Sequence, residues 1–457
     1  MSLKTESYQL NLASQLLKID LKPSHELVIL ANRIDWDMLE HKLKPFFQKT
    51  GRKAKRTRLM AGLLFLKHMH NLSDRQVVAM IHENVYFRHF CGLNWHIGEW
   101  NSESVIDSST LTKFRRRLGK AGLKVIEDLI KAQLFAEKRI SKKTALVDST
   151  AQEKHIAHPT NASLLARGMQ HLVKTINKLK VLGLKIKVRS HKRLARKELL
   201  KINKLGRGRK ERVVQALKNL TKYASSVRKA AAKAAQSATE QATGIAKVTA
   251  DKLQGLLKQQ ITLFDKAIHQ ALAWLNQEKI SSKEKILSLH EPHTTVIAKG
   301  KRRNRYEFGA KVSLSADRNH YIVGHQEYAE NIADVKSLDL ALKDWQNTFG
   351  DLPDELGTDR GYYTKRPTEL TSRIKHLAIQ NKGKNPHPCH DKAFFKRLQR
   401  KRNILEAVIG HLKTDHRMNR CRYKGQVGDT MNVGLAVTAW NLRKWAREVR
   451  KEMKISA

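Results

Sequence analysis

The chain has 457 residues, enough for two or three domains with a large hydrophobic core. Its 89 Lys and Arg residues against 42 Asp and Glu give a formal net charge of +47, and a polyanion such as nucleic acid would relieve the resulting repulsion. No apolar run approaches the roughly 18 residues of a membrane span, the N-terminus is too polar for a signal peptide, and the three cysteines are widely separated. The composition argues against a membrane protein, a disulfide framework and a zinc finger, and predicts a protein of the reducing cytoplasm.

Residues 1–138 are predicted to be mostly helical. Apolar residues recur at helical spacing on both sides of a break at Asn71–Asp74, which predicts two helices joined by a short turn. Basic residues flank this pair, including Arg115 and Arg116. The pattern favours a helix-turn-helix in an N-terminal DNA-binding domain, and the alternative is an ordinary helical hairpin with a solvated basic rim.

The next segment predicts a strand followed by a helical insertion. Residues 144–147 are short and apolar and predict a buried strand that ends at Asp148. From about 162 to 285 the helical period returns, and Lys and Arg far outnumber the acids. This insertion has two interpretations, a surface that follows DNA phosphates or a set of solvated helices around a modest core.

Strands return after the insertion and alternate with helices. Residues 294–298 and 306–315 predict a β-hairpin whose turn carries the basic residues Lys299, Lys301, Arg302 and Arg303. Further short strands follow, one of which stops at Asp359, and then two long helices. The order predicts an α/β domain over residues 139–450, with a mixed five-stranded sheet and helices on its faces.

Three carboxylates are candidates for a catalytic metal site. Asp148 and Asp359 follow apolar strands, where open α/β sheets commonly place their sites. Holding two hard cations near a phosphodiester needs a third acid, and Glu406 is the candidate. At 100° per residue, Arg402, Glu406 and Lys413 lie within roughly 40° of one another on a helix, beside its apolar stripe. The alternative is a surface ladder of ion pairs, for which Arg402 before Glu406 is the less favourable order.

The segments around these acids resemble the DDE transposases of bacterial insertion sequences, in particular the group named after insertion sequence five. The matching segments are VDST with the following HPTN, KGKRRNRYEFGAKVS, GTDRGYY, and the Arg402-x3-Glu406-x6-Lys413 spacing. RLMAGLLFLKHMHNLSDRQVV and STLTKFRRRLG are similar to the N-terminal domain of that family. Gln399 is a departure, because the wider motif often has Tyr at this position.

The resemblance implies an RNase H-like core with Asp148, Asp359 and Glu406 as the metal-binding catalytic triad. It implies two Mg²⁺ ions, for which Mn²⁺ can substitute, and DNA phosphate contacts from Arg402 and Lys413. The expected partner is double-stranded DNA, both transposon ends and target, bound by a homodimer at the nucleoid in the bacterial cytoplasm. We expect Lys299, Lys301, Arg302, Arg303, Arg115 and Arg116 to contribute to DNA binding.

The implied function is recognition of terminal inverted repeats, followed by DNA cleavage and strand transfer. Two alternatives stay open on the sequence. One is an RNase H-like nuclease that cleaves without joining, and the other is a catalytically inactive DNA-binding protein derived from a transposase.

Overall fold

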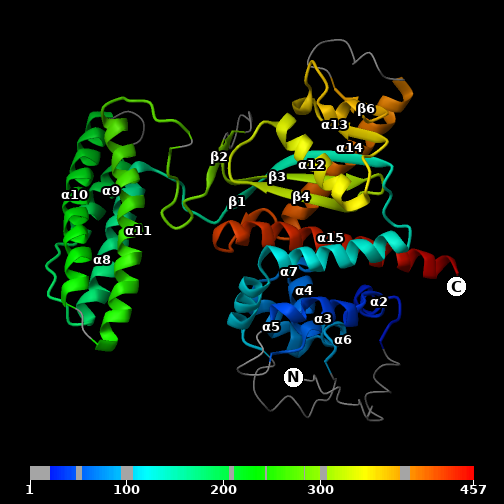
Figure 1. Ribbon diagram of the computed structural model, residues 1–457, viewed down its shortest axis with the longest axis horizontal. Helices are drawn as coiled ribbons and strands as arrows, with labels where there is room; N and C mark the ends of the chain where they lie inside the picture. The colour runs from blue at the N-terminus through cyan, green and yellow to red at the C-terminus, as the bar shows by residue number, and fades with distance from the viewer. Residues whose placement is uncertain are drawn as a thin grey trace. The chain divides into compact units, whose positions relative to one another are not determined.

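The computed structural model describes residues 21–47, 54–93, 106–204, 210–241, 244–282, 284–298, 306–380 and 392–456. The chain divides into two compact units (Figure 1). Unit 1 comprises Met1–Glu153 and Ala310–Ala457, and unit 2 comprises Lys154–Gly309. Each unit has buried apolar clusters of its own. None of the helices in the described ranges is long and apolar enough to cross a membrane.

The first part of unit 1 is helical. Its elements are α2 (Glu26–Arg33), α3 (Trp36–Leu43), η1 (Lys44–Phe46), α4 (Thr57–Met69), α5 (Asp74–Glu83), α6 (Val85–Phe90) and α7 (Ser108–Ala136). The predicted pair of helices around residues 71–74 is confirmed as α4 and α5. Ser73 caps α5 through a capping box with Gln76, which explains why the chain restarts a helix there. Helix α4 is buried along almost its whole length, so it forms core rather than surface.

The described strands form one mixed sheet. They are β1 (Thr144–Lys154), β2 (Thr295–Ala298), β3 (Tyr306–Asp317), β4 (Ile322–Tyr328), β5 (Glu355–Thr358), β6 (His376–Ile379) and β7 (Arg420–Cys421). The order is β2-β3-β1-β5-β6, with β4 on β3 and β7 on β1. Strands β1, β5 and β6 run parallel, whereas β2–β3 and β3–β4 are antiparallel. The mixed α/β class is confirmed, but the predicted count of five strands is wrong, because seven are present in the described residues.

Strand β1 also continues past Asp148, where it was predicted to end. The residues that follow are polar and therefore predict a loop, yet most are buried. Tertiary partners satisfy them: Gln152 donates to the Asp429 carbonyl at 3.2 Å and accepts from Asn432 at 2.6 Å. These hydrogen bonds remove the cost of burying a polar strand.

Helices cover both faces of the sheet. The remaining elements of unit 1 are α12 (Asp334–Phe349), η3 (Arg360–Tyr362), α13 (Glu369–Ser372), α14 (Lys392–Thr414) and α15 (Gly425–Ile455). Along β1 the side chains alternate between two clusters. Ala145 and Val147 belong to the cluster that includes α7 and α12 residues, whereas Leu146 packs with residues of α14 and α15. Asp148 therefore lies on the α14 side of the strand, two residues after Leu146.

Unit 2 is built mainly from four long helices, as the insertion pattern predicts. They are α8 (Asn161–Val181), α9 (Lys192–Lys204), α10 (Lys210–Gln241) and α11 (Gly244–Leu275). Small and branched residues fill the core between them, with Phe264 packed against Gly168, where an added Cβ would lie only 2.1 Å from the ring. Strand β2 pairs with the first four residues of β3.

Candidate active site

Two aspartates meet where the parallel pairing of β1 and β5 ends. Val147 and Thr358 are the last register partners of these strands, and Asp148 and Asp359 are the next residue of each. Neighbouring strands lie about 4.8 Å apart, so the two residues are adjacent. The Asp148 carboxylate accepts from the Ser149 N–H at 2.7 Å. The Asp359 carboxylate caps η3 by accepting from the Gly361 N–H at 2.8 Å.

Helix α14 is fixed over this edge of the sheet by its apolar stripe and by one amide. The predicted stripe is buried, including Leu398, Leu405 and Leu412 at 0 % exposure. Gln399 donates to the Thr358 carbonyl at 3.1 Å and the Ala378 carbonyl at 2.7 Å, at the ends of β5 and β6. Gln399 thus anchors α14 one turn before Arg402.

The guanidinium of Arg402 joins Glu406 to Asp148. Its Nη1 lies 3.4 Å from Asp148 Oδ2, and its Nη2 donates to Glu406 Oε1 at 2.7 Å. The Arg402 side chain is 12 % exposed and that of Glu406 58 %, so Glu406 stands at the rim and Arg402 below it. The site therefore brings together the two predicted aspartates, the predicted glutamate and the predicted arginine.

A fourth carboxylate, Asp334, completes the cluster and was missed by the sequence interpretation. Its Oδ1 accepts from Lys311 Nζ at 2.6 Å and Ser149 Oγ at 3.2 Å. An added Cβ on Gly361 would lie 2.9 Å from Asp334 and 3.0 Å from Asp359, so both carboxylates border this glycine. Asp334 is the first residue of α12, where acids are common for helical reasons, and no local signal distinguishes it.

The electrostatics of the site favour a cation. The pKa of Asp148 is raised to about 7, by burial first and, against the opposing Ser149 N–H, by the nearby Asp359 charge. The pKa of Asp359 is also raised, by burial first and, after the opposing Gly361 N–H, by the charge of Asp334. Arg402 pairs with Asp148 and Glu406, and Lys311 pairs with Asp334.

The donor chemistry fits a hard divalent ion, because every acidic ligand is a carboxylate oxygen. Within the described ranges, no group of three or more His, Cys, Asp or Glu side chains lies close enough to hold one metal ion. The Arg402 guanidinium lies between Asp148 and Glu406, so it separates these two carboxylates.

The other predicted site residues lie elsewhere. Lys413 is in the last turn of α14, about 10 Å along the helix from Glu406. Arg115 is nearly buried and donates to both carboxylate oxygens of Asp74, at 2.8 and 2.6 Å, whereas Arg116 is exposed. The hairpin residues Lys299, Lys301, Arg302 and Arg303 lie outside the described residues.

Comparisons with known proteins identify both ends of the chain. Residues 16–117 match a family model described as "Transposase domain (DUF772)", and residues 360–446 match one described as "Transposase DDE domain". An uncharacterized protein from Rhizobium meliloti, ORF8 in the nfe locus, is 36 % identical over 195 residues, covering 41 % of this chain and 89 % of the relative. No solved structure matches significantly.

The chain therefore belongs to the DDE transposases of insertion sequences, as the resemblance predicts. The second matched region begins at Arg360, directly after Asp359, and includes Arg402, Glu406 and Lys413.

Proposed function

We propose that the chain binds the terminal inverted repeats of its own DNA element and cuts and joins phosphodiesters with Asp148, Asp359 and Glu406. The observation that carries this proposal is the Arg402 guanidinium, which contacts Asp148 and Glu406 together beside Asp359. Three acids far apart in sequence thereby converge on the rim of the sheet. The parallel pairing of β1 and β5, which ends just before these aspartates, supports an RNase H-like core, and the motif spacing supports the group of insertion sequence five.

The triad would hold two Mg²⁺ ions, or Mn²⁺, which supply an activated water or 3′-hydroxyl nucleophile and stabilise the leaving 3′ oxygen when bound. Arg402 has a further role toward the DNA. Among the described residues, its Nε–H is one of the buried polar groups that have no hydrogen-bond partner. A phosphate oxygen would satisfy that donor, and Lys413 would contact a second phosphate as a point charge.

The same proposal includes the partners predicted from the sequence. A transposase acts on double-stranded DNA, and two transposon ends must be processed together, which favours a homodimer with two-fold symmetry. Its place of action would be the nucleoid in the bacterial cytoplasm. Contacts of the hairpin 299–303 and of the basic insertion with DNA stay predictions.

The test uses DNA carrying the ends of the element that encodes the chain. We expect Glu406→Gln to abolish Mg²⁺-dependent cutting while gel-shift binding stays within about twofold, because Glu406 is exposed and supports no core contact. Asp128→Asn, an exposed acid of an i,i+3 pair on α7, is the matched control and should cut normally. Normal cutting by Glu406→Gln would remove Glu406 from the mechanism.

A second assay separates the two alternatives. A precut end with a free 3′-hydroxyl is mixed with target DNA, and joined products are counted. A transposase joins them, a nuclease cuts but does not join, and an inactive DNA-binding protein does neither.

A further inference from the structure

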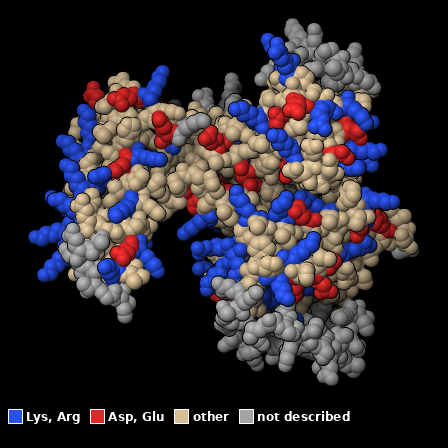
Figure 2. Space-filling view, viewed as in Figure 1, with Lys and Arg blue, Asp and Glu red and all other residues tan. Residues whose placement is uncertain are grey.

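A second group of cations in unit 1 lines a cleft of about 830 Å³. Its walls come from the end of α4, the start of α5, α7, the segment that joins α14 to α15, and the first two turns of α15. Figure 2 shows Lys and Arg side chains gathered at the edge of unit 1 where α7 and α15 begin. The basic residues among the described lining are Lys67, Arg115, Arg116, Arg417, Arg420, Arg422 and Lys424. We call this the basic cleft; Asp74 is the acid among its described lining residues.

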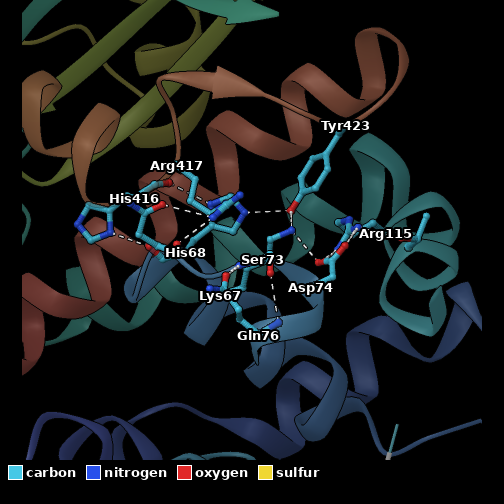
Figure 3. A network of polar contacts seen from close by, with 11 residues as sticks. Lys67, His68, Ser73, Asp74, Gln76, Arg115, His416, Arg417 and Tyr423 are labelled. Carbon is cyan, nitrogen blue, oxygen red and sulfur yellow. Dashed lines mark hydrogen bonds and ion pairs between the residues drawn. The ribbon is translucent and has the colours of Figure 1, made fainter. Parts of the chain in front are cut away.

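A buried network fixes the inner wall of the basic cleft (Figure 3). Asp74 accepts from Lys67 at 2.6 Å and from both Arg115 terminal nitrogens. The Tyr423 hydroxyl accepts from Lys67 at 2.8 Å and lies 3.2 Å from His68 Nε2. The Tyr423 ring also lies 4.5 Å from Lys67 Nζ and 4.3 Å from the Arg115 guanidinium carbon. Asp74 is thus already paired with the inner cations Lys67 and Arg115. The contacts of Tyr423 with the same two cations hold its segment against α4 and α7.

The same segment presents its other cations outward. Exposure alternates along it, with Cys421 and Tyr423 facing the protein and Arg420, Arg422 and Lys424 exposed. In an extended chain such alternate residues are roughly 6–7 Å apart, about two steps of the 3.4 Å rise per phosphate along one DNA strand. Arg420 pairs with Glu153 at 2.9 Å. For Arg116, Arg422 and Lys424, no ion pair forms with any residue in the described part of the chain.

Charge in the basic cleft is unbalanced. The pKa of Lys67 is lowered to about 7, by burial first and then by the Arg115 charge, against the opposing effect of Asp74. The pKa of Arg417 is also lowered, by burial first, with Arg422 and Arg115 among the charges that repel it. An anion in the cleft would relieve this repulsion.

Strand β1 connects the basic cleft with the candidate active site. Its residue Glu153 pairs with Arg420, and the Glu153 N–H donates to the Asn419 carbonyl at 3.1 Å. Glu153 is five residues after Asp148 on the same strand, which corresponds to about 16 Å. This distance is about half a helical turn of duplex DNA, so one duplex can reach both places.

We propose that the basic cleft is a second DNA-binding site, in which Arg116, Arg422 and Lys424 contact phosphates of a duplex that continues to Asp148. The choice of DNA as the polyanion rests on the proposed function. Arginine guanidinium groups suit phosphate oxygens, and the proposed contacts would involve the sugar-phosphate backbone rather than base edges. The cleft would therefore position DNA without selecting its sequence.

The test measures binding of the full chain to a fluorescein-labelled 30-base-pair duplex of random sequence, over a series of salt concentrations. The cleft variant is Arg116→Gln/Arg422→Gln/Lys424→Gln. The control variant, Lys142→Gln/Lys451→Gln/Lys454→Gln, removes the same charge at exposed positions near the start of β1 and the end of α15, far from the cleft. Circular dichroism melting checks that both variants fold.

We expect the cleft variant to bind at least about tenfold more weakly, with a log–log salt slope shallower by about 0.9 for each lost phosphate contact. The control variant should keep the wild-type slope. Equal affinity and slope in the two variants would overturn the inference. The cutting assay tests the proposed catalysis separately. If the wild-type chain does not cut DNA but the cleft variant still loses binding, the DNA-binding cleft is supported and the proposed catalysis is rejected.

Discussion

Asp148 is a buried carboxylate that lies beside a second carboxylate, Asp359, and receives one N–H hydrogen bond and the Arg402 charge. Its pKa is raised to about 7 mainly because burial disfavours the charged form. An unfolded Asp titrates near pH 4. The folded chain therefore binds more protons at Asp148 between about pH 4 and 7, and the free energy of unfolding falls as the pH rises through that window.

At this residue we predict that Asp148→Asn stabilises the metal-free protein at high pH. The stability difference between variant and wild type should grow by on the order of a few kcal/mol from pH 4 to pH 8, because Asn carries no charge to bury. Urea unfolding in EDTA at several pH values measures it, with Asp128→Asn as the exposed control. A stability difference between Asp148→Asn and wild type that is constant across pH would contradict the raised pKa of Asp148.

Helix α14 is the element on which the site depends, since it carries Arg402 and Glu406 and is anchored to the ends of β5 and β6. The anchor is Gln399, at the position where the wider motif often has an aromatic residue. Its amide satisfies two strand-end carbonyls, and the two sheet strands in turn fix the helix.

At the scale of this element we predict that Gln399→Leu destabilises unit 1 by about 1–3 kcal/mol, because the Thr358 and Ala378 carbonyls lose a donor. Cutting should slow as well, because Arg402 and Glu406 shift with the helix. Gln215→Leu removes an exposed helical glutamine that donates to Asn219 within α10, and should change neither quantity. Wild-type stability and rate in Gln399→Leu would show that the apolar stripe alone holds α14.

The whole molecule consists of two compact units with separate hydrophobic cores. Unit 1 carries the candidate active site and the basic cleft, although it is assembled from both ends of the chain. Unit 2 interrupts it between β1 and β3, and its helices have their own apolar interior. Separate cores are the physical condition for separate unfolding.

For the whole molecule we predict two thermal transitions in calorimetry. Leu220→Ala, at a fully buried position of unit 2, should lower one melting temperature, and Leu435→Ala, fully buried in unit 1, should lower the other. Each cavity costs about 2–5 kcal/mol. A single transition lowered by either variant would mean that the units unfold together.

Much of this protein was predictable from the sequence because it depends on local periodicity. The helices of the N-terminal region and of the insertion follow from the 3.6-residue period, the capped turn at Ser73 from its side chain, and the short apolar strands from their composition. The apolar stripe of α14, with Arg402 and Glu406 beside it, also follows from helical geometry.

Only the tertiary structure decided which side chains meet. The polar end of β1 looks like a loop until Asp429 and Asn432 provide its hydrogen bonds, and β7 is too short to be recognised without β1. Asp334 joins the acids of the candidate active site, and Arg422 and Lys424 line the basic cleft, through contacts between segments far apart in the chain. The sequence by itself determined the charge and most of the elements, because both are local quantities. The pairing of carboxylates and cations across the sheet depends on packing, which no local pattern encodes.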